Sequence, residues 1–579
     1  MCTKRMMVCW LAFKNLPKSF FDDKETQNFF AFFNSKIPVP KRNQASGMIS
    51  NEFQKMQENV KNLLSQNESK FGFTVDGWSG KTRRSYYGIT IHYIDVDWIL
   101  RSLAIDFKPS KGKHSGADIA KTFFESAKYY NVLDKIAGIT LDNVSANSTF
   151  IEELKTILEN ENIEFDINDQ HFRCLAHVLN LGVQDILKLM QVVCENDSSE
   201  EYEEEYLNSE DAEYSDADEE ISEIDQETND LNPNSVANLV KKVRKLHCKI
   251  RNSEPLAIKL KKKCDALEIK YRKPEYDSKT RWNSTFDMLQ SAEDLKDALN
   301  LLCQQNDDLR KYTITSAEWD LIEDLIHFLK DFKRVSEKIS GEKYVTLPVA
   351  VIAFNCLLDK IEKKCFELDN KNQRDGTDEK LIEAFQAGKN KLIKHYHKCN
   401  WVYCVSLVLD PRVKAEGLSL TEWGREMKQE TLKKFRSIYK SYYAKFDTAS
   451  CEEPSRKKRK RANEEESLDF DVLFVTTDAL SNSEKEIDDY LRSPRPGPDT
   501  DILLWWKKYA NVYPILSRMA RDILCVQATS VPVERLFKEA SLVLTKQRCS
   551  LADKSLKELI LTNTWMKSSL KKDICEVQL

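Results

Sequence analysis

The spacing of apolar residues changes twice along the chain, and each change predicts a different kind of structure. Residues 1–68 have helical spacing, with a phenylalanine-rich stretch over 20–33 that we expect to pack in a core or an interface. Between residues 69 and 192, short β-prone apolar runs alternate with helical patterns. Helical spacing then returns from about residue 236. The pattern predicts an α-rich α/β protein.

Five strands and three helices are expected between residues 69 and 192. The strands are predicted at 71–75, 86–94, 98–105, 137–141 and 171–174, and the helices at about 116–130, 145–158 and 175–190. The first three strands are joined by short connections, including a tight hairpin at 95–97, whereas the last two are reached through helices. This order is typical of a ribonuclease H-like fold, a five-stranded mixed sheet whose first and fourth strands are central neighbours. A large all-helical insertion is expected to interrupt that fold.

Charge is distributed unevenly along the chain. The stretch 195–230 carries 18 acidic residues and no Lys or Arg, so it cannot bury enough apolar surface to order itself. The whole chain has 88 basic and 93 acidic residues and a net charge of −5, so the remainder without this stretch has a net charge of +13. That balance favours a partner rich in phosphate.

These patterns divide the chain into six parts. They are an N-terminal helical region (1–68), the first part of the ribonuclease H-like core (69–192), an acidic disordered linker (193–235), a helical insertion domain (236–446), a disordered basic and acidic loop (447–498) and the C-terminal part of the core (499–568).

Composition argues against membrane and disulfide-rich classes. Mean hydropathy is −0.54, and no run of about 18 or more apolar residues is present, so we expect no membrane-spanning segment. Residues 1–13 predict an amphipathic helix rather than a signal peptide. The 15 cysteines are scattered, which favours reduced thiols over a disulfide framework, and their spacing does not predict a zinc finger.

Two carboxylates follow the predicted central strands. Asp76 comes directly after the run 71–75, and Asp142 directly after 137–141. Because ligand sites form at the carboxyl ends of neighbouring strands, the pair suits divalent metal ions that promote phosphoryl transfer. The alternative for Asp142 is a cap on the helix that begins near residue 145.

Five short motifs follow one another along the chain. They are Asp76-Gly77-Trp78, Leu141 to Asn147 (LDNVSAN), Cys174 to Leu181 (CLAHVLNL), Thr280 to Thr285 (TRWNST), and Pro532 to Phe537 (PVERLF) leading to Arg548 and Leu551. In these motifs and in their order, the chain resembles, from about residue 69 to 568, the hAT superfamily of DNA transposases (hobo, Activator and Tam3) and the host proteins derived from it.

The resemblance implies an acidic triad of Asp76, Asp142 and Glu534. Two Mg²⁺ or Mn²⁺ ions held by these carboxylates would activate the attacking water or 3′-hydroxyl and stabilise the leaving oxygen. Carboxylates that share two such ions are expected roughly 4–8 Å apart.

The resemblance also implies a set of DNA-binding residues. They are Trp78 and Trp282, which would lie where an aromatic ring can stack on an extruded base, Arg281 and Arg535, and Cys174 and His177 of a CxxH motif. For Trp282, the alternative is packing in a core. Two ligands are too few for a structural zinc site, so a structural or DNA-contacting role is favoured for Cys174 and His177.

Three departures from the family pattern bear on activity. No set of Cys and His residues of the BED zinc-finger type precedes Asp76, so no zinc finger is expected. The serines of the usual Ser-Glu-Arg-x-Phe-Ser motif are Val533 and Lys538 here, and a glycine that follows in the family is Ser541. The acids remain while their surroundings have changed.

Two further segments indicate partners and location. The block 499–568 resembles the family's dimerisation region, and its many apolar residues are expected to serve the core first and an interface second. A basic run predicts a nuclear import signal or, alternatively, a solvated charge run that contacts nucleic acid weakly. That run is Arg456, Lys457, Lys458, Arg459, Lys460 and Arg461.

These features predict a nuclear, DNA-binding, dimerising protein derived from a transposase, with weak or no catalysis and no membrane partner. The alternative is an active transposase that cleaves and transfers DNA strands with divalent metal ions. A third hypothesis is a protein-interaction factor that acts through the helical insertion and the C-terminal block.

Overall fold

The computed structural model describes most of the chain. The described residues are 2–34, 36, 38–79, 84–110, 115–190, 236–275, 277, 282–371, 376–396, 401–420, 424–450, 482–544 and 551–575. The predicted acidic linker, the basic run 456–461 and Arg281 lie outside these ranges. Within the described residues, no helix is long and apolar enough to cross a membrane.

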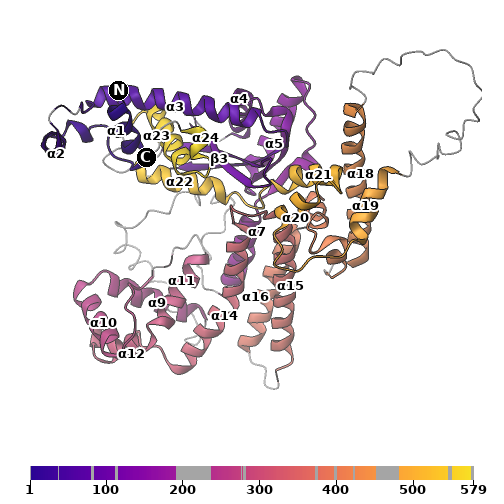
Figure 1. The fold of residues 1–579 in the computed structure, drawn as a ribbon. Helices are drawn as coiled ribbons and strands as arrows, with labels where there is room; N and C mark the ends of the chain where they lie inside the picture. Colours follow the sequence, from indigo (N-terminus) through magenta and orange to yellow (C-terminus); the bar gives the residue numbers. More distant parts are fainter. Residues whose placement is uncertain are drawn as a thin grey trace, which may run out of the picture.

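A single five-stranded mixed sheet forms the centre of the α/β part (Figure 1). Its strands are β1 (Phe71–Ser79), β2 (Ser85–Ile94), β3 (Leu100–Pro109), β4 (Ile136–Leu141) and β5 (His171–Arg173). Their order is β3-β2-β1-β4-β5, with β1–β2 and β2–β3 antiparallel and β1–β4 and β4–β5 parallel. The predicted fold class is confirmed, with β1 and β4 as central neighbours.

Two strand boundaries differ from the prediction for reasons visible in the pairing. β1 continues past residue 75 because β2 pairs with it as far as Ser79, so Asp76 lies inside the strand rather than after it. β3 begins at Leu100 rather than 98, because the Asp95 carboxylate accepts hydrogen bonds from the amides of Asp97 and Ile99, each at 2.9 Å, and extends the turn.

Helices of the N-terminal part and of the sheet region surround this sheet. They are α1 (Cys2–Phe13), α2 (Lys24–Phe33), α3 (Arg42–Ser65), α4 (Gly116–Tyr129), α5 (Ser145–Asn160), α6 (Ile167–Gln170) and α7 (Leu175–Leu189), with the short 3-10 helices η1 (Phe20–Asp22) and η2 (Leu133–Lys135).

A long run of helices follows α7. They are α9 (Val236–Arg251), α10 (Glu254–Ala266), α11 (Trp282–Asp294), α12 (Lys296–Gln304), α13 (Asp307–Arg310), α14 (Ser316–Ile339), α15 (Leu347–Asp369), α16 (Gly376–Tyr396), α17 (Val402–Val408), the 3-10 helix η6 (Lys414–Leu420) and α18 (Gly424–Ser450).

The C-terminal helices return to the sheet. They are α19 (Asn482–Arg492), α20 (Ile502–Tyr509), α21 (Pro514–Leu524), α22 (Val531–Val543), α23 (Asp553–Lys567) and α24 (Lys571–Ile574). Helix α19 lies within the loop that was predicted to be disordered, and it is held because Ile487 and Tyr490 on one face are fully buried.

The two faces of the sheet carry different helices. On one face, Phe73 of β1 packs edge-on against Phe123 of α4, with ring centroids 5.1 Å apart, and Phe123 contacts Phe150 of α5. On the other face, α21, α22 and the connection between them lie over the central strands. Helix α23 packs against β3, and its Trp565 donates a hydrogen bond to the Ala104 carbonyl at 2.8 Å.

The C-terminal helices belong to the hydrophobic core. Trp506, Leu516, Ile560 and Trp565 are fully buried. Residues of α20 and α21 join the core of the helical insertion, whereas those of α22 and α23 join the core around the sheet. The expected core role of this block is therefore confirmed.

Candidate functional site

Asp76 lies within β1, and Asp142 lies directly after the neighbouring strand β4. The parallel β1–β4 register pairs Thr74 with Thr140, and each aspartate lies two residues further along its own strand direction. Because side chains two residues apart in a strand share a face of the sheet, the Asp76 carboxylate projects from the face that carries Thr74. Asp142 directly follows Leu141, the last residue of β4. The register brings the two positions to the same end of neighbouring parallel strands, and the shared metal site stays a prediction.

Helix α22 lies over the same face and carries Glu534. Asp76 is the antiparallel partner of Gly88, and directly opposite residues point to the same face. A side chain at Gly88 would meet Val533 and Phe537 of α22 at 2.6 and 2.8 Å. Glu534 lies in the first turn of α22 between these two contact residues. The third acid therefore belongs to the helix that covers Asp76.

The segment before α22 crosses the central strands at very short range. Gly72 and Gly138 are register partners in β1 and β4, and an added Cβ at either would lie 2.9 or 3.3 Å from Val526. Thr140 also donates a hydrogen bond from its hydroxyl to the Gln527 carbonyl at 2.6 Å. The absence of side chains at the two glycines thus lets the C-terminal segment dock.

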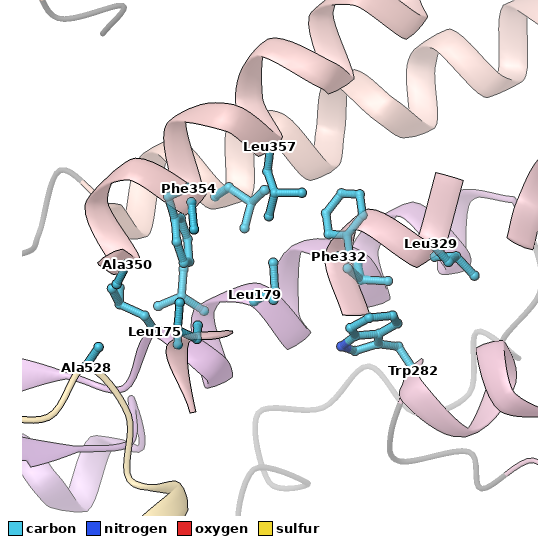
Figure 2. Packing of buried hydrophobic residues seen from close by; sticks show 14 of the residues in the cluster. Leu175, Leu179, Trp282, Leu329, Phe332, Ala350, Phe354, Leu357 and Ala528 are labelled. Carbon is cyan, nitrogen blue, oxygen red and sulfur yellow. The ribbon is translucent and has the colours of Figure 1, made fainter. Parts of the chain in front are cut away.

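Helix α7 is fixed to the same segment at its N-terminus. The Leu175 amide donates to the Ala528 carbonyl at 3.0 Å, and the Ser530 amide donates to Cys174 Sγ at 3.3 Å. Figure 2 shows Leu175 beside Ala528, with Ala350 and Phe354 of α15 packed against them. Three distant parts of the sequence meet here.

The environment of Asp142 combines burial with several polar neighbours. Burial raises the pKa of its carboxyl, while the charge of His177, the Val144 amide and the Asn147 side chain lower it, and the net direction is upward. Asn147 donates to Asp142 Oδ1, and the Val144 amide donates to the same atom at 3.4 Å. The N-cap of α5 is Val144, so Asp142 organises the turn that leads into this helix without being its N-cap.

Cys174 and His177 of the CxxH motif each lie near one of the acids. Burial raises the pKa of the Cys174 thiol to about 11, and the negative charge of Glu534 adds to this rise although the Ser530 amide opposes it. Cys174 is therefore a neutral thiol near Glu534, while His177 acts on Asp142. This arrangement favours the structural role among those predicted for the CxxH motif.

Trp78 and Arg535 lie at the edge of the same region. The half-buried Trp78 ring stacks on Phe537 of α22, with centroids 6.0 Å apart and ring planes 11° from parallel. The exposed Arg535 donates to the Ser340 carbonyl at 2.8 Å and forms an ion pair with Glu342, which ties α22 to the connection between α14 and α15. Both residues are thus near the acids.

Three parts of the chain match family models. Residues 74–168 match the ZBED1 RNase-like domain, 225–328 the ZBED1 RNase-like helical domain, and 486–566 the hAT family C-terminal dimerisation region. The order of the matches follows the sheet, the helical insertion and the returning C-terminal helices. This is an hAT transposase-like protein.

Relatives of this hAT-like protein cover most of the chain. A Zea mays protein named as an AC transposase is 26% identical over 95% of the chain and 64% of its own length. The transcriptional regulator tpeD of Talaromyces stipitatus is 26% identical over 89% of the chain and 56% of its own length. The BED zinc-finger protein RICESLEEPER 2 of Oryza sativa is 22% identical over 89% of the chain and 67% of its own length. The hAT-like chain thus spans about three fifths of the length of these relatives.

The second tryptophan of the hAT pattern lies away from this region. Trp282 is only 2% exposed and packs against Phe332 of α14, with ring centroids 6.4 Å apart. Figure 2 shows Trp282 next to Phe332, while Leu175 and Ala528 lie at the other end of the view. The structure therefore shows Trp282 packed in the core, and a DNA contact by Trp282 stays a prediction.

The three carboxylates Asp76, Asp142 and Glu534 are chemically suited to a divalent metal ion, but they are not arranged as a metal site. Carboxylate oxygens are the ligands that Mg²⁺ and Mn²⁺ prefer, and all three acids border the junction of β1, β4 and α22. However, among the described residues, no three His, Cys, Asp or Glu side chains are gathered so that they could hold a metal ion.

The sequence prediction did not include several residues that build the site. Gly72, Gly88 and Gly138 make room for the C-terminal segment and for α22. Their signal was present, because glycine inside an otherwise β-prone strand marks a close approach of another chain segment. Ser530, whose amide meets Cys174, carries no comparable signal.

Proposed function

We propose that this protein binds DNA in the nucleus as a dimer and that its ribonuclease H-like core cleaves DNA weakly or not at all. The proposal rests on two features of the junction between β1, β4 and α22. Asp76, Asp142 and Glu534 border it, as a DNA-processing core requires, yet no three described ligands form a metal site.

Charge and relationship support DNA as the partner. Outside the stretch 195–230 the chain has a net charge of +13, which favours contact with phosphates. The names of the relatives also support DNA as the partner, since they include an AC transposase, a transcriptional regulator and a BED zinc-finger protein. Arg535 is an exposed cation beside the junction.

Self-association is supported by the C-terminal match. The hAT family C-terminal dimerisation region covers residues 486–566. Within it, Leu504, Val512 and Leu542 expose more than half of their surface, although most apolar side chains of the region are buried. These three side chains are candidates for the interface.

The experiment combines DNA binding with a cleavage assay. The purified chain is incubated with hairpin DNA and with terminal-inverted-repeat DNA in the presence of Mn²⁺. Binding that weakens steeply with salt, without nicking, supports the proposal. The absence of DNA binding at low salt would overturn it and leave the protein-interaction hypothesis.

An active transposase is the second candidate, because Asp76 and Asp142 each lie two residues beyond the register partners Thr74 and Thr140, and α22, which contacts β1, carries Glu534. In the same assay, this candidate requires Mn²⁺-dependent nicking that Asp76→Asn abolishes. Nicking that survives Asp76→Asn would come from a contaminating nuclease and would not support it.

Nuclear import is assigned to the basic run 456–461. Six consecutive Lys and Arg residues form this run, which matches the composition of import signals. A fluorescent fusion of the full chain should accumulate in the nucleus, and replacing the six residues by Ala should abolish the accumulation. Unchanged nuclear accumulation in the variant would show that import uses another segment.

A further inference from the structure

A large cavity lies between α14, α15 and the segment 495–503. Its volume is about 1290 Å³. Pockets for small molecules have volumes of roughly 300–1,000 Å³, so this cavity is large enough for a segment of a macromolecule. We call it the α14–α15 groove.

One face of α15 forms an aliphatic floor. Val349, Ile352, Ala353 and Leu357 line the groove at intervals of three and four residues, and Leu503 of α20 lines the opposite side. The lining face extends from Val349 to Lys360, a rise of about 16 Å along a helix. That length matches three turns of a second helix. Val349 and Ile352 remain partly exposed, whereas Ala353 and Leu357 are buried, so the first two are the part of the stripe that a partner can contact.

Basic side chains surround this floor. The lining includes Arg334, Lys338, Lys343, Lys360, Arg412 and Arg495 against Asp331, Asp499 and Asp501. Lys360 is neutralised by Asp331, and Arg412 by Asp410 at 2.6 Å. In the part of the chain that the structure describes, Lys338, Lys343 and Arg495 form no ion pair. Three cations therefore remain available beside an apolar stripe.

We propose that the α14–α15 groove is a docking site for an acidic amphipathic helix of a partner protein. The partner's apolar side chains would pack on the floor formed by α15, in the manner of a helix that binds in a groove. Its carboxylates would face Lys338, Lys343 and Arg495, which gives charge complementarity at the rim. Asp76, Asp142 and Glu534 are not among the residues that line the groove, and the proposal does not rest on DNA binding.

The composition of the floor favours a peptide over nucleic acid. Single-stranded nucleic acid is held by cations together with aromatic rings on which bases stack. Among the described lining residues only Tyr344 is aromatic, and its hydroxyl donates to the Lys338 carbonyl at 2.7 Å. Aliphatic side chains instead match the Leu, Ile or Val residues of an amphipathic helix.

The test uses the full chain and a fluorescent peptide of about 15 residues, with Leu at helical i, i+3, i+4 and i+7 spacing and Glu elsewhere. Binding is followed by fluorescence anisotropy. The double variant Lys338→Glu/Lys343→Glu should weaken binding about tenfold or more. Cys356→Glu, which places a carboxylate on the exposed part of the lining, should weaken it as well. The matched control is Lys363→Glu on α15, since Lys363 is 77% exposed and does not line the groove.

Chemical labelling gives an independent readout. Cys356 lines the groove and is exposed, so the peptide should protect it from a maleimide, as read by mass spectrometry of the digested protein. Denaturation midpoints of the variants close to that of the natural chain would show that the fold is retained.

Three results would overturn the proposal. One is equal affinity of the natural chain and the Lys338→Glu/Lys343→Glu variant for the peptide. A second is equal binding of a peptide with Ser in place of every Leu, which would reduce the interaction to charge alone. A third is a chain that binds oligothymidylate but not the peptide, and whose affinity for oligothymidylate falls in the same variants. That result would make the groove a nucleic-acid site.

Discussion

Asp76 and Gly88 are register partners across β1 and β2, and the face that they share is covered by α22. The missing side chain at Gly88 gives room to Val533 and Phe537, which flank Glu534. The distance between α22 and the first aspartate is thus set by a glycine on the neighbouring strand. Packing and the placement of the third acid depend on the same contact.

Gly88→Ala is expected to push α22 away from the sheet. Its Cβ would lie 2.6 Å from Val533 Cγ2 and 2.8 Å from the Phe537 ring, and overpacking of this kind costs about 1–3 kcal/mol. Urea denaturation should show a lower midpoint for the variant. The matched control is Gly47→Ala in α3, where an added Cβ meets nothing within 4 Å, and helix propensity should make it neutral or stabilising. Equal effects of the two changes would contradict the role of Gly88.

Asp142→Asn is expected to stabilise the fold at neutral pH. Burial raises the pKa of Asp142 in the folded state, so the folded chain binds this proton at a higher pH than the unfolded chain. Stability therefore falls as pH rises from the ordinary carboxyl pKa of about 3.9 through the raised value. The denaturation midpoint of the variant should exceed that of the natural chain at pH 7, and the difference should shrink towards pH 4.

The control for this prediction is Asp359→Asn, a change at an exposed position of α15. Its midpoint should follow that of the natural chain at both pH values. A variant Asp142→Asn that is less stable at pH 7 would show that the hydrogen bonds from Asn147 and Val144 outweigh the cost of burying the charge.

The sheet was predictable because local patterns agree with its topology. Alternating apolar runs and crossover helices placed β1 next to β4, and the register of Thr74 with Thr140 follows that order. The extension of β1 through Asp76 was not predictable from propensity, since Gly77 is a poor strand residue and only pairing with Tyr87 keeps it in the ladder.

The position of the C-terminal segment was predictable only through resemblance. Periodicity identifies α22 as a helix, but the contact of Val526 with Gly72 joins residues more than 450 positions apart in the sequence. The glycine inside the strand signals a close approach, but no local pattern identifies the segment that approaches it. The buried position of Trp282 was not predictable from the sequence either. Its helical spacing fits a core position as well as an exposed one, and only tertiary packing against Phe332 decides between them.

Arg535→Ala is expected to separate DNA binding from stability. Its side chain is 44% exposed where it pairs with Glu342, and exposed ion pairs contribute only about 0–1 kcal/mol. The denaturation midpoint should therefore change little, while affinity for DNA should fall and the salt slope should decrease by about 1 if a phosphate contact is lost. Lys538→Ala, an exposed cation one turn further along α22, is the control. A large loss of stability without a change in the salt slope would assign Arg535 a purely structural role.

The last prediction concerns self-association through the C-terminal helices. Leu504 and Val512 are 61% and 60% exposed, whereas the neighbouring Trp506 is fully buried and donates a hydrogen bond to the Leu409 carbonyl at 2.9 Å. An interface on this region would therefore use the first two side chains and leave the tryptophan in the core. Leu504→Asp with Val512→Asp should raise the dissociation constant of self-association about tenfold or more, because a charge in an apolar interface remains desolvated and unpaired.

Sedimentation velocity over a range of protein concentrations measures that change. The control is Ile258→Asp on α10. Its side chain is 49% exposed and lies outside the dimerisation region 486–566, so this change should leave self-association unaltered. The denaturation midpoint should stay within the small range expected for surface substitutions, about 0.5 kcal/mol, in both variants. Unchanged self-association in the double variant would show that the interface lies on another face of the protein. The next candidate would then be Leu542 on α22, which is also an exposed apolar residue of the dimerisation region.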